Sequence, residues 1–211
     1  MATRTVILAR HGQTELNRLG IVQGSGVDPG LNAEGREQAE QLARAFAEPF
    51  DVYVSSGMQR ARETLAAVAP PGAALEVDER FREICWGVHE GKVATTESRG
   101  EYKDLMRAWQ SGDYDAAFTG AESARQLADR LWAGWQALTA REFERAIVVM
   151  HGRALRCLAC LLDAAPLSRM DDYPHANAGY YVVEHETDAW RLAARNVTDH
   201  LTPPVATPAA S

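Results

Sequence analysis

The sequence predicts an α/β fold, a three-layer sandwich whose mostly parallel central sheet has helices on both faces and a small capping insertion. Short apolar runs rich in β-branched residues alternate along the chain with longer segments in which apolar residues recur every three or four positions. The first pattern is typical of parallel strands buried on both faces, and the second is typical of amphipathic helices. Strands that alternate with helices indicate a sheet covered by the helices that connect its strands.

The first strand and the first helix are separated by a long loop. The run TVILA at residues 5–9 predicts a strand, and the polar, glycine-rich stretch 12–31 predicts a loop. Asn32 can accept a hydrogen bond from the first turn of a helix that follows it, and Pro49 ends that helix. One apolar face, with the spacing i, i+3, i+4 and i+7, consists of Ala39, Leu42, Ala43 and Phe46.

A strand, a helix and a second strand follow. Residues 51–55 (DVYVS) predict a strand, and residues 58–69 predict a helix that the sequence PPG at 70–72 stops. A short strand is expected at 74–77. Residues 78–97 show no clear period, so no element is predicted there.

The second half of the chain continues the alternation. Its expected elements are helices at 101–110, 122–139 and 153–163 and strands at 147–150, 180–184 and 190–194, the last two joined by a turn at 186–188. The segment from about 86 to 120 is interpreted as an insertion that caps a site. We assign residues 1–202 to one domain and expect the Pro- and Ala-rich tail, 203–211, to be flexible.

Composition and charge argue against several classes of protein. The chain has 211 residues and a formal net charge of −7, which argues against a nucleic-acid binder but allows an anionic small molecule, because a pocket can be locally positive. No apolar stretch approaches the ~18–20 residues that span a membrane. The N-terminus passes directly into a short apolar run without the pattern of a signal peptide. We therefore expect a cytoplasmic protein, and nothing in the sequence indicates its oligomeric state.

The cysteines raise a separate question. Cys85, Cys157 and Cys160 are an odd number without a secretory signal, which argues against a disulfide framework. Cys157 and Cys160 form a CxxC motif, for which a redox or metal site is the functional alternative. No second cysteine pair or nearby histidine completes a zinc set, and the flanking sequence LRCLACLL is apolar. We interpret both residues as packing residues on a buried helix.

Two of the predicted strands end on a histidine followed by a glycine. TVILA leads into Arg10-His11-Gly12, and AIVVM leads into His151-Gly152. Ligands of open α/β sheets bind beyond the carboxyl ends of the strands, so both histidines are expected at one such edge. Glycine suits a tight exit from the strand and a close approach of the backbone to a ligand.

Arg60 is expected to bring a further positive charge to this edge, from the end of another strand. It lies about one helical turn past the end of the second strand, where a guanidinium group suits a phosphate or a carboxylate. Arg62, two positions on, is expected to face elsewhere and to be a surface residue. The sequence therefore predicts two arginines and two histidines around an anion.

This pattern resembles the histidine phosphatase superfamily, also called the phosphoglycerate mutase-like family. The stretches that carry the resemblance run in order over about residues 5–185: RHGQTELN at 10–17, LNAEGREQAEQLA at 31–43, SSGMQRARET at 55–64, REICWGVHEG at 82–91 and VVMHG at 148–152. The first matches the family's Arg-His-Gly-x-Thr-x-x-Asn, and the third matches its Ser-Ser-x-x-x-Arg. One such motif is a weak signal, whereas five in order are specific.

The resemblance implies a nucleophile and the groups that hold its target. His11 would attack phosphorus and form a phosphohistidine. Arg10, Arg60 and His151 would neutralise charge on the phosphoryl oxygens. The groups expected to bind the phosphate or to lie against the leaving group are Asn17, Gln23, Gly24 and Gly152.

Glu83 is the acid/base that the resemblance implies. The leaving alkoxide needs a proton, the water that attacks the phosphohistidine must lose one, and one carboxyl can do both. Glu90 is a rival in the same segment, interpreted as a structural carboxylate. The remaining histidines, interpreted as surface or packing residues although the first is close enough to the site to touch a substrate, are His89, His175, His185 and His200.

The resemblance implies a phosphomonoester hydrolase that acts on a small phosphorylated metabolite. Family mutases usually carry Glu-Arg-His-Tyr-Gly-x-Leu where this chain reads EICWGVH, and an adjacent arginine pair that this chain lacks. The alternatives are a phosphoglycerate mutase and a non-catalytic member that binds a phosphorylated ligand. The arginines replace a cation, so no metal or other cofactor is expected. Selectivity is expected to lie in the insertion, which includes Trp86, Tyr102, Trp109, Tyr114 and Phe118.

Overall fold

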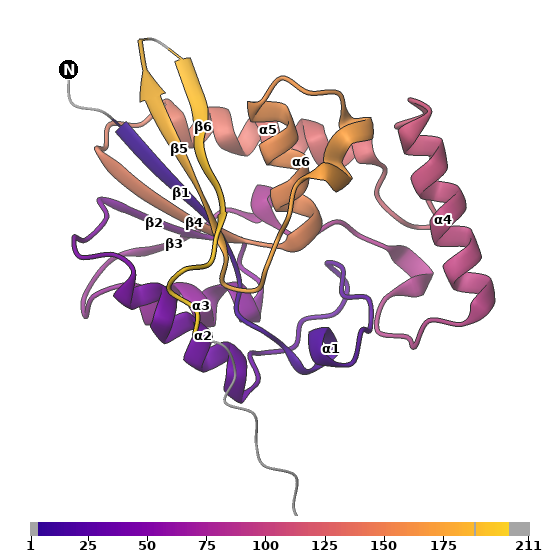
Figure 1. The fold of residues 1–211 in the computed structure, drawn as a ribbon, viewed down its shortest axis with the longest axis horizontal. Coiled ribbons are helices and arrows are strands. Elements are labelled where there is room, and N and C mark those ends of the chain that lie inside the picture. The colour runs from indigo at the N-terminus through magenta and orange to yellow at the C-terminus, as the bar shows by residue number, and fades with distance from the viewer. Residues whose placement is uncertain (1–3, 188, 203–211) are drawn as a thin grey trace, which may run out of the picture.

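The computed structural model describes residues 4–187 and 189–202, and its centre is a six-stranded sheet (Figure 1). The strands are β1 (Arg4–Arg10), β2 (Val52–Ser55), β3 (Leu75–Val77), β4 (Arg145–Met150), β5 (Tyr180–Glu186) and β6 (Ala189–Val197). The helices are α1 (Glu15–Arg18), α2 (Ala33–Arg44), α3 (Gln59–Val68), α4 (Thr96–Gln110), α5 (Ala124–Thr139) and α6 (Gly152–Leu162). Short 3₁₀ turns occupy Glu79–Phe81, Gly87–His89 and Leu167–Asp172.

The sheet is mixed and mostly parallel, which confirms the predicted fold class. Its strand order is β3-β2-β4-β1-β5-β6. The first four strands in this order are parallel, and β5 runs antiparallel to both of its neighbours. In the β1–β4 pair Arg10 lies opposite Met150, so His11 and His151 leave the sheet next to each other.

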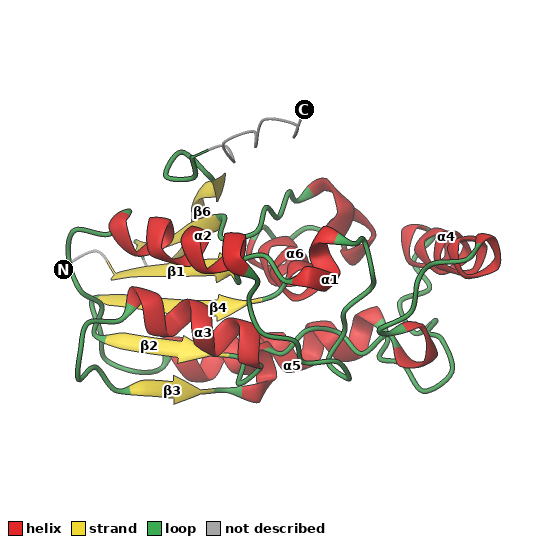
Figure 2. Cartoon of the chain, turned by 90° about the horizontal axis from the view of Figure 1, so that it is seen from below, coloured by secondary structure: helices red, strands yellow, loops and turns green. Residues whose placement is uncertain are grey.

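Helices cover both faces of the sheet (Figure 2). Ile7 and Ala9 of β1 pack in one core with residues of α2 and α3. Val6 and Leu8 pack in a second core with residues of α5 and α6. Successive side chains of a strand point to opposite faces, so a strand between two helical layers must be apolar throughout, as TVILA is.

α4 lies apart from the sheet, beyond the carboxyl ends of its strands (Figures 1 and 2). It begins at Thr96, earlier than the expected residue 101, because Thr95 and Ser98 form reciprocal hydrogen bonds that cap its first turn. The segment 86–120 consists of this helix, the turn Gly87–His89 and the adjoining loops. We propose that this segment is the cap of the site described below.

Short helical turns occupy two stretches in which no element was predicted. α1 lies within the predicted loop 12–31, and Thr14 and Asn17 cap it reciprocally. Residues 78–97 contain two 3₁₀ turns, which are too short to show a period. α2 ends at Arg44, before Pro49, and the other boundaries shift by a few residues.

Part of the predicted turn at 186–188, namely Asp188, and the predicted flexible tail lie outside the described residues. Among the described residues, no helix combines the length and the apolar character that crossing a bilayer requires.

Candidate active site

A cavity of about 360 Å³ lies at the carboxyl end of the sheet. The predicted site residues that line it are Arg10, His11, Asn17, Gln23, Arg60, Glu83 and Gly152. The other two, His151 and Gly24, lie behind this wall, where both contact Arg60. Residues from stretches far apart in the sequence therefore meet in one cavity.

His11 is held as a neutral ring with one nitrogen free. Its Nδ1 lies 2.7 Å from the carbonyl oxygen of Gly12, and the side chain is 3% exposed. A carbonyl can only accept, so Nδ1 carries the proton and Nε2 has a free lone pair. Burial lowers the pKa of His11 well below its usual value, and the charges of Arg60 and Arg10 lower it further. The ring is therefore unprotonated at Nε2 at neutral pH.

Gly12 is required by the packing of a helix against the strand end. A Cβ at this position would lie 2.3 Å from the carbonyl oxygen of Gly35 in α2. The Gly12 N–H donates to Thr64 Oγ1 of α3 at 3.0 Å. Gly12 therefore lets the backbone of α2 approach the end of β1. The expectation that this glycine permits a close approach to a ligand instead was wrong.

Arg10 has an unused donor in the cavity wall. Its Nη1 donates to the carbonyl oxygen of His175 at 2.7 Å, while its buried Nε has no acceptor among the described residues. Burial lowers the pKa of Arg10 to about 10, against the opposing effect of the Glu83 charge. The side chain remains charged at neutral pH.

Arg60 is fully buried and is oriented by three contacts. Its Nε donates to His151 Nδ1 at 3.2 Å, and its two Nη atoms donate to the carbonyl oxygens of Val27 (3.1 Å) and Gly24 (3.2 Å). Burial lowers its pKa, and the charge of Glu83 opposes that shift. Arg62 is exposed, as the sequence predicted.

His151 uses both of its ring nitrogens within the protein. Arg60 donates to Nδ1, so Nε2 carries the proton and donates to Ser56 Oγ at 2.7 Å. Burial, followed by the charge of Arg60, lowers the pKa of His151 well below its usual value. The ring centroids of His151 and His11 are 5.1 Å apart. His151 therefore supports Arg60 and His11 from behind, without facing the cavity.

Thr14 holds the side chains of both Asn17 and Gln23 through their amide oxygens. Thr14 donates from its backbone N–H to Asn17 Oδ1 and from its hydroxyl to Gln23 Oε1. Because both amide oxygens are occupied, the amide nitrogens are the groups available to a ligand. Gln23 Nε2 is buried and has no acceptor among the described residues.

Glu83 closes the cavity at the N-terminus of α6. It is 7% exposed, and its carboxylate accepts hydrogen bonds of 3.0 Å from the backbone N–H groups of Ile84, Arg153 and Ala154. Two of these donors belong to the first turn of α6, where N–H groups have no partner within the helix. The helix end therefore fixes the position of this carboxyl in the cavity wall.

Glu90, the rival carboxylate, serves a different purpose. It accepts hydrogen bonds of 2.6 Å from the backbone N–H groups of Gly26 and Trp86, and it does not line the cavity. It joins the loop that carries Gln23 to the start of the insertion, which fits the structural interpretation.

Three basic residues of the cavity wall could not be predicted from the motifs: Arg153, Arg156 and His175. The interpretation of His175 as a surface or packing residue is wrong, because its ring lines the cavity and accepts from Arg156 Nε at 2.9 Å. Burial, with the charges of Arg10 and Arg156, lowers its pKa to about 3. A Cβ on Gly152 would lie 2.6 Å from this ring, so the glycine lets α6 begin against it.

The remaining candidates are packing residues. His185 packs against Trp190, and His200 packs against Tyr180. Cys157 and Cys160 are fully buried in the core on α6, which confirms the packing interpretation of the CxxC motif.

Comparisons with known proteins place the chain in a family. Residues 6–198 match the family model described as the histidine phosphatase superfamily (branch 1). The phosphoserine phosphatase 1 of Hydrogenobacter thermophilus is 30% identical over 200 residues, 93% of each chain. A Salmonella choleraesuis protein named "Probable phosphoglycerate mutase GpmB" is 32% identical over 167 residues, which is 76% of this chain and 75% of that protein.

A solved structure shows the same fold. The phosphoserine phosphatase of Entamoeba histolytica, in complex with 3-phosphoglyceric acid, superposes with a TM-score of 0.82 and 25% identity over 94% of this chain and 100% of that chain. The family model covers nearly the whole sequence, including every residue that lines the cavity. The chain therefore belongs to branch 1 of the histidine phosphatase superfamily.

Proposed function

We propose that the chain is a phosphomonoester hydrolase that acts on a small phosphorylated metabolite through a phosphohistidine at His11. The observation that carries the proposal is the neutral His11 ring, whose Nε2 lone pair is free, in a cavity that Arg10 and Arg60 also line. A neutral imidazole nitrogen is a competent nucleophile, and guanidinium groups neutralise the phosphoryl oxygens that it approaches.

Two orphaned donors support an oxyanion as the ligand. Arg10 Nε and Gln23 Nε2 are buried, belong to residues that line the cavity and have no acceptor among the described residues. Buried polar groups almost always have a hydrogen-bond partner. A phosphoryl group brings three strong acceptor oxygens and satisfies both donors at once.

The proposed reaction consists of two displacements. First, a bond forms between His11 Nε2 and phosphorus as the bond from phosphorus to the ester oxygen breaks. Glu83 enters this step in its protonated form, as the second step leaves it, and gives its proton to the departing alkoxide. Water then attacks phosphorus, Glu83 takes a proton from that water, and the phosphorus–nitrogen bond breaks. The products are an alcohol and inorganic phosphate, and His11 returns to its neutral form.

The surrounding groups act by position and charge, which dominate phosphoryl transfer. Arg10 and Arg60 hold the phosphoryl oxygens, with the amide nitrogens of Asn17 and Gln23 as further donors. The Gly12 carbonyl keeps the proton on His11 Nδ1 and stabilises the phosphorylated ring. We propose that His151 contributes chiefly by orienting Arg60, because neither of its ring nitrogens faces the cavity.

Hydrolysis is favoured over mutase activity by the sequence after Glu83 and by the relatives named phosphoserine phosphatases. The relative named as a mutase makes isomerisation the second candidate. The two are separated by ³¹P NMR of the wild-type protein incubated with O-phosphoserine and with 3-phosphoglycerate. We expect inorganic phosphate as the product, and no phosphate release from the His11→Asn variant. Accumulation of 2-phosphoglycerate would show a mutase, whereas binding without turnover of any phosphomonoester would show a non-catalytic member.

The proposed chemistry uses no metal ion, because guanidinium groups supply the positive charge. Phosphate release is therefore expected to be unchanged by EDTA and to be inhibited by vanadate, which adopts the five-coordinate geometry of the transferring phosphoryl group. A loss of activity in EDTA that is restored by a divalent cation would contradict this part of the proposal.

A further inference from the structure

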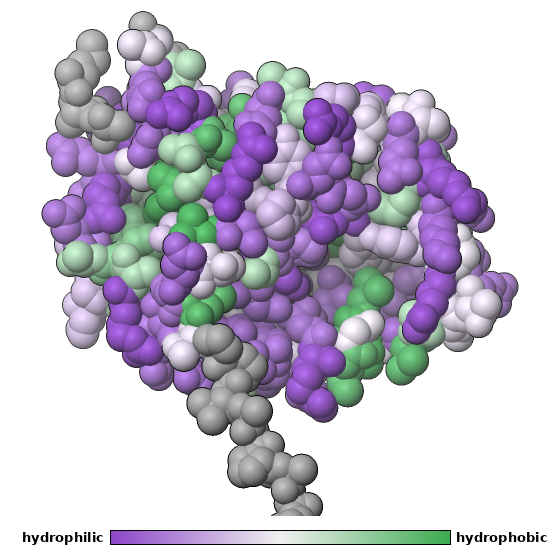
Figure 3. Space-filling model, in the orientation of Figure 1, coloured by the Kyte–Doolittle hydropathy of each residue, from purple (hydrophilic) through white to green (hydrophobic). Residues whose placement is uncertain are grey.

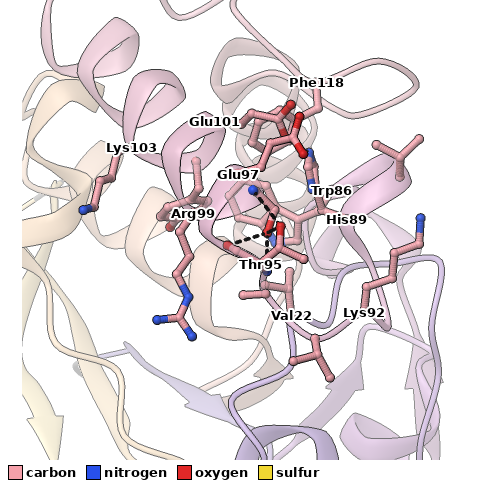
Figure 4. Close-up of a pocket in the computed structure, with 15 residues that line it drawn as sticks. Val22, Trp86, His89, Lys92, Thr95, Glu97, Arg99, Glu101, Lys103 and Phe118 are labelled. Carbon is pink, nitrogen blue, oxygen red and sulfur yellow. Dashed lines mark hydrogen bonds and ion pairs between the residues drawn. The ribbon is translucent and has the colours of Figure 1, made fainter.

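A second cavity, of about 650 Å³, adjoins the first and is the larger of the two (Figure 4). Val22, Trp86 and Tyr102 line both cavities, so these three residues mark the boundary at which the two meet. The second is enclosed by the insertion: α4 contributes Tyr102, and the segments before and after that helix contribute His89 and Phe118. The second cavity is therefore the neighbouring space that is available to the alcohol portion of a phosphate ester held at His11.

Part of the wall of the second cavity is aromatic and aliphatic. Trp86 has its ring centroid 5.6 Å from that of Tyr102 and 6.3 Å from that of Phe118. Val88 and Val93, also in the wall, are 55% and 75% exposed. Figure 3 shows hydrophobic residues gathered on the surface between α1 and the lower end of α4. Exposed apolar groups that gather around a cavity are typical of a ligand-binding surface.

The charges of the two cavities favour an uncharged group in the second. In the first, Arg153 and Arg156 share the single carboxylate of Asp171, at 2.8 Å and 2.6 Å, and Arg60 lies 3.7 Å from Asp28. With Arg10, the arginines of this cavity therefore carry more positive charge than these carboxylates neutralise, which suits a phosphoryl dianion. The rim of the second cavity mixes both signs, and those side chains are Lys92, Glu97, Arg99, Glu101 and Lys103. Within the described residues, the second cavity therefore offers no concentrated charge for a carboxylate or a second phosphate.

We propose that the preferred substrate is a phosphomonoester whose alcohol carries an uncharged, flat apolar ring, seated in the second cavity beside Trp86, Tyr102 and Phe118. This inference rests on the proposed function and narrows its substrate class. Small polar alcohols such as serine or glyceric acid would occupy the first cavity and leave the aromatic wall unused. Apolar rings gain affinity from burial and from offset contacts with aromatic side chains.

The test compares two esters that differ only in the ring: ethyl phosphate and 2-phenylethyl phosphate. Both leave as primary alkoxides of similar basicity, so a difference in kcat/KM reports binding of the ring. We expect kcat/KM of the wild-type protein to be higher for the ring-bearing ester by about tenfold or more, the order expected from burying a phenyl group. Equal values for the two esters would overturn the inference while leaving phosphatase activity in place.

A variant with a matched control locates the effect. Val88→Asp puts a charge in the wall of the second cavity, whereas Val77→Asp puts the same charge on β3, outside both cavities, at a residue of nearly equal exposure (56%). Val88→Asp is expected to remove most of the preference for the ring, with kcat/KM for ethyl phosphate changed by less than about twofold. Val77→Asp is expected to leave the preference intact. Equal effects of the two substitutions would contradict the proposed seat.

Binding measurements separate this inference from the proposed function. Calorimetric titration of the His11→Ala variant with both esters measures affinity in the absence of the nucleophile. Tighter binding of 2-phenylethyl phosphate without turnover by the wild-type protein would support the seat and overturn the phosphatase proposal. Turnover of both esters by the wild-type protein, with equal affinity of the variant for the two, would support the phosphatase proposal and overturn the proposed seat.

Discussion

At the scale of single residues, hydrogen bonds decide which histidine can react. The two rings lie side by side, and both are neutral. The lone pair of His151 accepts from Arg60, whereas the lone pair of His11 has been left free because Gly12 holds the proton on the other nitrogen. This difference explains why only one of the two His-Gly pairs is proposed as the nucleophile.

The acid/base assignment is tested by comparing two carboxylates. Glu83→Gln is expected to lower kcat for an alkyl phosphate by about 10²–10⁴, because the amide cannot supply the proton that the alkoxide needs. The loss should be smaller for an ester of an acidic phenol, which leaves without a proton. Glu90→Gln is the control: its single amide oxygen keeps one of the two hydrogen bonds, from Gly26 or from Trp86, and because Glu90 does not line the cavity this variant should retain far more of kcat than Glu83→Gln. Near-normal turnover of the alkyl ester by Glu83→Gln would remove it from this role.

At this scale the sequence predicts the site residues that belong to a motif. It does not predict those that only the folded chain brings to the cavity. Asn17 could be predicted because it belongs to the motif RHGQTELN, and Gln23 because the family resemblance implies a phosphate contact at its position. His175 and Arg156 enter the cavity from the segment after β4, where no spacing marks them. The inward position of His175 depends on its hydrogen bonds with Arg10 and Arg156, which only the folded chain brings within reach.

At the scale of elements, close backbone packing positions the strand ends. The segment after β1 lies against the first turn of α2: a Cβ on Gly12 would lie 2.3 Å from the carbonyl oxygen of Gly35, and a Cβ on Gly35 would lie 1.9 Å from that of Gln13. This backbone contact fixes the position at which β1 ends and the loop begins. It therefore also fixes the direction of the His11 side chain. The short helix α1 and the early start of α4 depend on reciprocal capping by Thr14 with Asn17 and by Thr95 with Ser98, signals that a search for apolar periodicity overlooks.

Two glycine-to-alanine substitutions test this packing with opposite expected signs. In Gly12→Ala the new methyl group would lie 2.3 Å from a backbone oxygen, so we expect lower stability and lower kcat. Gly100, within α4, has open space at the position of a Cβ, and Gly100→Ala is expected to raise the free energy of unfolding by roughly 0.5–1 kcal/mol. Denaturant unfolding measures both. If Gly12→Ala had the stability and the kcat of the wild type, α2 would be able to move away from the strand end at little cost in free energy.

At the scale of the whole molecule, the sheet gathers cations and neutral histidines in one buried place. The parallel order of β2, β4 and β1 brings their carboxyl ends together, as alternating strands and helices predicted. The place of β5 beside β1, antiparallel to it, could not be read from the sequence, because strand patterns carry no direction. Burial of the histidines without protons then links folding to pH.

Stability is expected to fall as the pH drops below about 6.5, the ordinary pKa of histidine. His11 and His151 have folded-state pKa values well below that of the unfolded chain, so the unfolded state binds more protons in this range and acid favours it. Each ring contributes a slope of about 1 kcal/mol per pH unit between pH 5.5 and 6.5. Chemical denaturation at several pH values measures the slope, and His151→Gln should reduce it. A slope that is flat or of opposite sign would contradict the neutral assignment of these rings.

The central claim is that phosphorus becomes bonded to His11 during turnover. The most direct measurement is to quench the wild-type protein in alkali, where phosphohistidine survives, during hydrolysis of a phosphomonoester, and to map the phosphate by peptide mass spectrometry. The account predicts an acid-labile phosphate on His11, present in the wild type, enriched in Glu83→Gln when the substrate is an ester of an acidic phenol, and absent from His11→Ala. Phosphate found on His151, or hydrolysis that continues in His11→Ala, would contradict it.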